Sequence, residues 1–238
     1  MIGARLVARA RCAALPLEVR ERLARLEPPP GFLGRRRRGC TELGLARFVV
    51  LDLETTGPSR DRDRVVAIGA VAVARRGIAH RDAYSAVLRQ QTVSAPANIL
   101  VHRIGGQRQL DGEDPVVALV SWLEYLATSA AVAYRADFDA RVLEREIEAV
   151  LGIRRRVPML DLAVLLPELF PGTGHGTLDA WLAHFGIVPL ARHDALGDAY
   201  ATAQLLLVAL AAAERVGSRT VADLGALEHT QRWMGRRR

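Results

Sequence analysis

The chain has 238 residues, half of them hydrophobic, and a formal net charge of +7. This length and apolar content fit one domain with a substantial core and exclude a largely disordered chain. Its two cysteines, Cys12 and Cys40, exclude a disulfide framework or a cysteine zinc site, and they suit a reducing cytoplasm.

Charge and hydropathy narrow the class of protein further. Every basic side chain apart from histidine is an arginine, and the positive excess favours a polyanionic partner. No run of 18 or more apolar residues occurs, so we expect no membrane-spanning helix and a cytoplasmic protein.

Residues 1–45 form a predicted N-terminal extension. Leu17–Leu26 is expected to be a short helix. Pro28–Arg38 should be an exposed linker, because prolines fix an extended backbone and adjacent arginines repel one another. The run Arg35–Arg38 is either a solvated stretch of charge or an arm that binds phosphates without sequence preference.

The next region predicts a sheet. Three segments rich in Val and Ile read as strands, namely Phe48–Glu54, Val65–Val73 and Tyr84–Leu88. The turn signal Arg75-Arg76-Gly77 predicts that the second and third strands pair as a hairpin. Asp114-Pro115 predicts a helix start, with a cap followed by proline in the first turn.

Strands and helices then alternate. We expect a strand over Ala130–Tyr134 and helices over Asp139–Leu151, Thr177–Phe185 and Ala195–Arg215. This order predicts an α/β fold with a mixed β-sheet flanked by helices. We place one domain at residues 46–217 and a C-terminal helical extension at 218–238, where Val221–Trp233 has apolar residues at helical spacing.

Two acids lie near the end of the first predicted strand. Asp52 and Glu54 are one residue apart, so in a strand they share one face. Two adjacent carboxylates repel each other unless a cation lies between them, and Mg²⁺ or Mn²⁺ prefers such oxygen ligands. The alternative is a strand end with two solvated acids.

Two later segments carry further candidates. Asp139 follows Phe138 at a predicted helix start, and His193 lies five residues before Asp198. Asp139 could also be an ordinary helix-start acid, which capping and the helix dipole favour. Asp198 could be a solvated helix position, and a histidine on its own is more often structural than catalytic.

These segments together resemble the DEDDh family of 3′–5′ exonucleases, which includes the proofreading subunit of bacterial DNA polymerase III, RNase T and oligoribonuclease. The motifs match in order over roughly Phe48 to Leu210, as Asp52-x-Glu54-Thr55-Thr56-Gly57, Phe138-Asp139 and His193-x-Ala195-x-x-Asp198. The resemblance implies a ribonuclease H-like fold, which agrees with the predicted order of elements.

The resemblance also implies roles for these residues. Two divalent ions, Mg²⁺ or Mn²⁺, about 4 Å apart would clamp the phosphodiester. Asp52 would bridge them, Glu54 and Asp198 would complete the nucleophile-side site, and Asp139 would serve the leaving-group side. His193 would take the proton from the attacking water, because a pKa near 6.5 suits a general base at neutral pH.

Substrate-binding candidates follow from the same resemblance. His102 and Ile104 match residues that line the pocket of the terminal nucleotide, although the family's glycine is Arg103 and its threonine is Gly105 here; a surface loop is the alternative. Tyr134-Arg135 replaces the family's usual His-Asn, and Arg135 adds a positive charge that could hold the strand. The remaining candidates are Leu53, Thr55, Thr56, Gly57 and Phe138.

The expected function is a metal-dependent 3′–5′ exonuclease that releases nucleoside 5′-monophosphates from a single-stranded 3′ end. DNA is the favoured substrate. RNA ends or short oligoribonucleotides are one alternative, and a non-catalytic nucleic-acid-binding or polymerase-tethering module is another. The sequence leaves open a polymerase subunit as partner and the oligomeric state.

Overall fold

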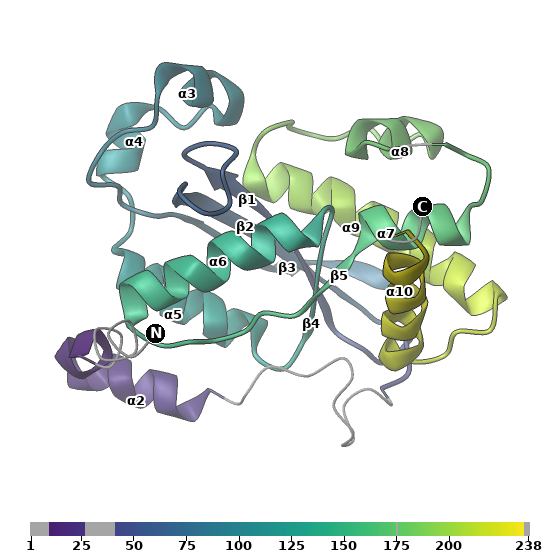
Figure 1. Ribbon diagram of the computed structural model, residues 1–238, viewed down its shortest axis with the longest axis horizontal. Helices are drawn as coiled ribbons and strands as arrows, with labels where there is room; N and C mark the ends of the chain where they lie inside the picture. Colours follow the sequence, from purple (N-terminus) through teal and green to yellow (C-terminus); the bar gives the residue numbers. More distant parts are fainter. Residues whose placement is uncertain (1–9, 27–40, 175, 236–238) are drawn as a thin grey trace.

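A five-stranded mixed sheet lies at the centre of the protein (Figure 1). The computed structural model describes residues 10–26, 41–174 and 176–235. The strand order is β3-β2-β1-β4-β5, where β1 is parallel to β4, β4 is parallel to β5, and β2 is antiparallel to β1 and β3. The strands are β1 Phe48–Thr55, β2 Val65–Ala74, β3 Gly77–Val87, β4 Ala130–Ala133 and β5 Met159–Asp161.

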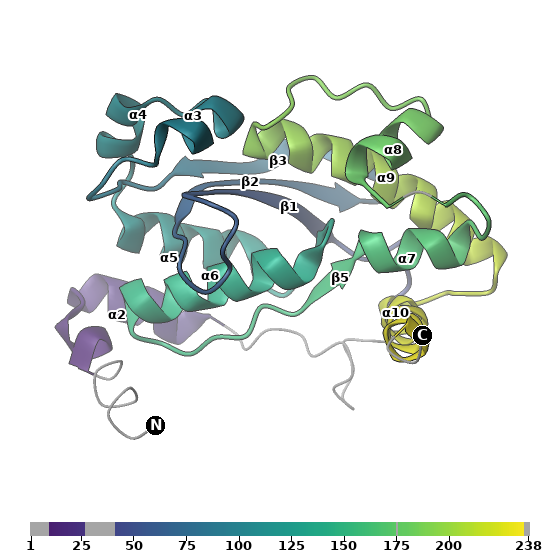
Figure 2. The ribbon, with the colours of Figure 1, turned by 45° about the horizontal axis from the view of Figure 1, so that its top comes forward.

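Helices cover both faces of this sheet. In Figure 2, α9 lies above it, while α5 and α6 lie below. The helices are α2 Leu17–Arg25, α3 Pro96–His102, α4 Gly106–Leu110, α5 Pro115–Leu126, α6 Ala136–Leu151, α7 Leu162–Leu169, α8 Leu178–His184, α9 Ala195–Arg215 and α10 Val221–Gly235. The mixed sheet with flanking helices confirms the predicted fold class.

Strand β1 supplies side chains to both cores, because successive residues of a strand point to opposite faces. Phe48 and Val50 pack with residues of α7 and α9. Val49 and Leu51 pack with residues of α5 and α6. Continuing the same alternation, Asp52 and Glu54 lie on the α9 face, as the sequence predicts.

The structure differs from the expected elements at several points, among them the short strand β5, which was not predicted. β3 begins at Gly77 rather than Tyr84, because its first half is an edge strand with many exposed or half-buried residues and no apolar run. Neither α3 nor α4 was predicted, since both are short. α7 was not predicted either, because it is only eight residues long and contains Pro167; it buries Leu162, Leu165, Leu166 and Leu169 at helical spacing.

Both chain extensions contact the central domain where they are described. Val19 of α2 is buried, and Arg22 forms an ion pair of 2.6 Å with Glu124 of α5. Val221 and Leu224 of α10 pack in the same core cluster as residues of α7. The two extensions also contact each other, since the N–H of Leu43 donates to the carbonyl of Arg219 at 2.9 Å. The division of the chain at residues 45 and 217 stays a prediction, and Pro28–Arg38 lies outside the described residues.

α9 is a core helix. By length and composition alone it could cross a membrane, but 61% of its apolar window is buried inside the fold. Its closest approach to the sheet is at Gly69 of β2, where a Cβ atom would lie 2.2 Å from the carbonyl carbon of Ala195. Only a residue without a side chain allows this contact.

Replacing Gly69 by alanine should therefore destabilise the protein by about 1–3 kcal/mol, because the added methyl group forces the first turn of α9 away from β2. Urea denaturation of both proteins measures the change. Gly77→Ala is the matched control, since no atom lies within 4 Å of its Cβ position. Equal free energies of unfolding for wild type and Gly69→Ala would contradict this account of the packing.

Candidate active site

The site lies where β1 extends beyond its parallel neighbour. Within the described residues, β1 pairs with β4 only over Phe48–Val50. Its pairing with β2 continues, and Asp52 stands opposite Gly69. Asp52 and Glu54 therefore lie past the carboxyl end of β4, with one side of their strand unpaired. Crevices at the carboxyl ends of parallel strands are common binding sites in open α/β sheets.

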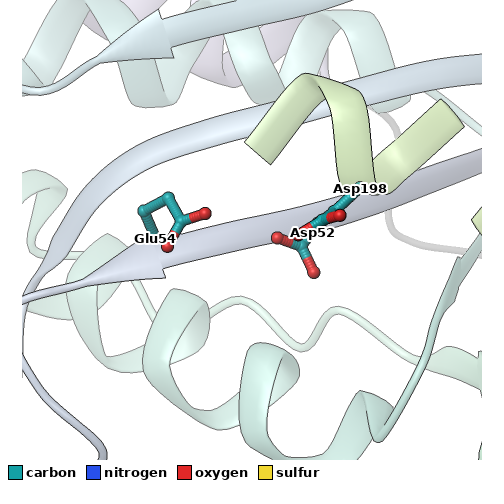
Figure 3. Close-up of side chains that lie close together, drawn as sticks. All are labelled: Asp52, Glu54 and Asp198. Atoms are coloured by element: carbon teal, nitrogen blue, oxygen red, sulfur yellow. The ribbon is translucent and has the colours of Figure 1, made fainter. Parts of the chain in front are cut away.

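Asp198 reaches the same place from the first turn of α9. The helix begins at Asp194, whose side chain accepts a hydrogen bond from the N–H of Gly197. The close approach at Gly69 sets the first turn directly over β1 and β2. As a result, carboxylate oxygens of Asp52, Glu54 and Asp198 lie within 4.8 Å of one another. Figure 3 shows Asp52 next to Asp198, with Glu54 further along the strand.

Asp139 lies beside this cluster at the start of α6 and is 7% exposed. Burial raises its pKa to about 8, and the charges of Asp161 and Glu54 add to the rise. Hydrogen bonds from the backbone N–H groups of Asp139 and Leu53 act in the opposite direction. Its carboxylate also raises the pKa of Asp52, so the fourth predicted acid belongs to the same electrostatic unit.

The cluster is costly in the absence of a cation. Burial raises the pKa of Asp52 well above its usual value, and Asp139, Glu54 and Asp198 each raise it further. Burial, followed by the charges of Asp198 and Asp194, raises the pKa of Glu54 to about 7. A divalent cation with a preference for carboxylate oxygens would relieve this repulsion. The donor set therefore fits Mg²⁺ or Mn²⁺.

One cation of the protein already contacts the cluster. The guanidinium of Arg192 forms ion pairs with Asp198 and, at 2.8 Å, with Asp179 of α8. This role was not predicted, because Arg192 is one of many arginines and its two partners lie on different helices, α9 and α8. It lowers the pKa of both Asp52 and Glu54, although less than burial raises them.

His193 follows Arg192 in a turn with a φ of 59°. Its backbone N–H donates to the second carboxylate oxygen of Asp198 at 3.0 Å, and the residue itself is exposed. The structure thus brings His193 to the metal-ligand candidates through its main chain. Gly197 makes this turn fit, since a Cβ there would lie 2.5 Å from the carbonyl oxygen of Ala191.

His102 and Ile104 do not form a surface loop. Both are buried, and Nδ1 of His102 accepts a hydrogen bond from the N–H of Ile104 at 3.0 Å. Arg103 between them has a left-handed φ of 56°. Ile104 packs against Ala195 in the first turn of α9. These two candidates are thus joined to the helix that carries Asp198.

The loop after β1 holds Thr55, Thr56 and Gly57 in place. The hydroxyl of Thr55 donates to the carbonyl of Gly57 at 2.7 Å, and the hydroxyl of Thr56 donates to Asp63 at 3.0 Å. A Cβ at Gly57 would lie 2.7 Å from a carboxylate oxygen of Asp63, so a larger residue there would displace this carboxylate from its contact with Thr56. The side-chain amide of Asn98 on α3 donates to the carbonyl of Thr56. Nothing in the charged sequence around Asp63 distinguishes it beforehand.

The remaining candidates lie at the start of α6, apart from Leu53, which lies on β1. Arg135 has a φ of 62°, and its backbone N–H donates to Asp161 at 2.9 Å. The same carboxylate caps α7 by accepting from the N–H of Ala163. Leu53 is buried and Phe138 is half-buried in the core between the sheet and α6. These two side chains therefore support the strand and helix that carry the acids.

Comparison with known proteins agrees with this geometry. The family model for exonucleases of the RNase T type matches residues 49–206, a span that contains all five predicted catalytic residues. The chain therefore belongs to this exonuclease family, and its three motifs identify the DEDDh type of 3′–5′ exonuclease.

Relatives include two kinds of DNA polymerase III sequence. The chain is 30% identical over 188 residues to the PolC-type DNA polymerase III of Thermotoga maritima, covering 79% of this chain but only 14% of that protein. It is 28% identical over 174 residues to the DNA polymerase III subunit epsilon of Buchnera aphidicola, covering 68% of this chain and 72% of the subunit.

Solved structures share the fold. E. coli Exonuclease I in complex with a dT13 oligonucleotide superposes with a TM-score of 0.61 at 17% identity, covering 72% of this chain and 42% of that one. Exonuclease X in complex with 5′ overhanging duplex DNA gives a TM-score of 0.59 at 23% identity, covering 77% of this chain and 99% of that one. The observed sheet and helices are thus the ribonuclease H-like fold expected from the sequence.

The raised pKa values predict how metal-free stability depends on pH. Folding raises the pKa of Glu54 from 4.5 to about 7 and that of Asp139 from 3.8 to about 8. The folded state then keeps protons that the unfolded state releases, so this contribution is complete below about pH 4 and is lost as pH rises through 7 and 8. Thermal melting in EDTA should show wild type losing stability over this window relative to Glu54→Gln/Asp139→Asn. Addition of Mg²⁺ at pH 8 should restore the wild type alone, whereas parallel profiles would contradict the assignment.

Proposed function

We propose that the protein is a metal-dependent 3′–5′ exonuclease that hydrolyses the terminal phosphodiester of a single-stranded nucleic acid, with DNA favoured, and releases nucleoside 5′-monophosphates. The supporting observation is the set of Asp52, Glu54 and Asp198, whose oxygens lie within 4.8 Å of one another at the open end of β1. Asp139 completes the four acids.

The chemistry of the donors supports this proposal. A phosphodiester is anionic, so a cluster of carboxylates alone would repel it. Two divalent ions, when bound, would supply the positive charge that polarises the phosphate and activates a water molecule. Asp52 would contact both ions, Glu54 and Asp198 would hold one, and Asp139 would hold the other.

His193 is proposed as the general base. Its position in an exposed turn beside Asp198 leaves it accessible to a substrate seated at the acids. The imidazole would accept the proton of the attacking water at a ring nitrogen, a role that histidine commonly takes in general-base catalysis. Thr56, Gly57, His102 and Ile104 would contact the terminal nucleotide, and Arg135 would hold the strand nearby.

The proposed substrate and setting draw on the relatives. These are DNA polymerase III sequences, and Exonuclease I was solved with a DNA oligonucleotide. The chain spans only about one seventh of the length of the PolC-type relatives. Association with a polymerase and action in the bacterial cytoplasm are therefore proposed for this chain by analogy with these relatives.

Digestion of labelled oligonucleotides tests the proposed reaction. Single-stranded DNA and RNA carrying a label at either end are incubated with Mg²⁺, Mn²⁺ or EDTA, beside circular single-stranded DNA. We expect stepwise shortening from the 3′ end, release of 5′-monophosphates, resistance of the circle and no reaction in EDTA. Cleavage of the circle would show an endonuclease, and binding without turnover would show a non-catalytic module.

Asp52→Asn should reduce nucleotide release to below about one hundredth of the wild-type rate, because it removes the shared ligand. In EDTA its melting temperature should equal or exceed that of wild type, since one of several repelling charges is gone. Glu18→Gln on the exposed face of α2 is the control and should behave as wild type. Release by Asp52→Asn at near the wild-type rate would refute the mechanism.

His193→Ala should slow turnover by roughly 10²–10⁴-fold, the usual contribution of a general base. Calorimetry should show that the variant still binds Mg²⁺, because His193 contacts Asp198 through its backbone N–H. The acidic limb of the pH–rate profile should flatten in the variant. An unchanged rate and profile would mean that another group accepts the proton.

A further inference from the structure

A second polar feature lies beside α6, outside the acidic site. It is a groove of about 450 Å³ whose lining comprises six arginines and three acids. We call it the arginine groove. The arginines are Arg60, Arg141, Arg145, Arg154, Arg155 and Arg156. The lining has a formal excess of three positive charges, and none of its residues belongs to the predicted catalytic set.

Arg145, Arg154 and Arg156 each contact other residues of the protein. Arg154 forms an ion pair with Glu148 at 2.6 Å, and Arg156 forms one with Glu144 at 3.1 Å. Arg145 donates to the backbone carbonyl of Asp61 at 3.1 Å and thereby ties the loop after β1 to α6. These contacts build a fixed wall.

Two arginines at the opening of the groove are different. Arg60 and Arg141 are both exposed, and in the part of the chain that the structure describes neither forms an ion pair or a hydrogen bond. Their charges are thus available to a ligand. A guanidinium can bind a phosphate with two parallel hydrogen bonds.

Two elements, α6 and the loop after β1, contribute residues both to the groove and to the acidic site. α6 carries Asp139 in its first turn and Arg141, Arg145 and Glu148 further on. The loop between β1 and β2 starts at Thr56 and reaches Arg60, and Figure 2 shows it next to α6. At about 1.5 Å and 100° per helical residue, the groove residues of α6 lie about 3 Å to about 14 Å beyond Asp139 along the axis, on the opposite side of the helix from its buried face.

We propose that the arginine groove binds phosphates of the same strand whose 3′ end enters the acidic site. This rests on the proposed function. Because the groove lies on the other side of α6, a strand from the acidic site would pass around a helix about 10 Å across before it reaches these arginines. The phosphates that they bind would thus lie several nucleotides from the 3′ end, beyond the reach of a trinucleotide. The lining contains no aromatic residue on which bases could stack. The contact is therefore with the backbone and independent of base sequence.

The test compares Arg60→Ala/Arg141→Ala with the matched pair Arg81→Ala/Arg215→Ala in the full-length chain. All four arginines are exposed, and Arg81 and Arg215 do not line the groove. Binding of a trinucleotide and of a single strand of about twelve nucleotides is measured by fluorescence anisotropy in EDTA across a salt series. Melting temperatures confirm that both variants fold.

The groove variant should bind the longer strand roughly tenfold more weakly at about 50 mM salt and converge with wild type at high salt. The slope of log K against log salt should fall by about 1.4, or about 0.7 for each lost contact with a single strand. Affinity for the trinucleotide, saturated turnover in Mg²⁺ and all properties of the control pair should be unchanged.

Three results would overturn the proposal: equal losses for short and long strands, an unchanged salt slope, or an equal effect in the control pair. Failure of the proposed function looks different. In that case the wild type would release no nucleotide in Mg²⁺, while the length-dependent contribution of Arg60 and Arg141 to binding would persist.

Discussion

Repulsion among carboxylates at the end of β1 is the constraint around which the site is arranged. Burial and mutual proximity raise the pKa of Asp52, Glu54 and Asp139, so the empty cluster opposes folding near neutral pH. A sheet that buries its first strand on both faces can hold such a cluster, because the apolar residues of β1 pack into two cores. The unpaired edge beyond β4 then leaves the acids open to a ligand.

Close backbone packing brings the acids together. Gly69 lets the first turn of α9 rest on β2, and this contact sets Asp198 over Asp52. Gly57 and Asp63 hold the loop after β1 in the same manner, through an approach that a side chain would prevent. The arrangement of the carboxylates thus depends on Gly69 and Gly57, although neither glycine takes part in the proposed reaction.

Much of this was predictable from local pattern. The two-residue spacing of Asp52 and Glu54 placed both on one strand face, and the cap at Asp114 marked the start of α5. Arg192 and Asp63 were not predictable, since each acts on residues whose proximity the folded chain creates. α7 escaped prediction because it is short, contains Pro167 and has apolar residues outside its buried stripe as well. The first half of β3 escaped prediction because an edge strand tolerates polar residues.

Arg192 pairs with one of the acids that are proposed to bind the metal. Its guanidinium bridges Asp198 on α9 and Asp179 on α8, so a cation of the protein already occupies one ligand of the acidic cluster. A metal ion that takes Asp198 would do so by exchange rather than by simple addition. Occupancy of the site is thereby linked to the bridge between two helices, and the acid cluster can communicate its state to α8.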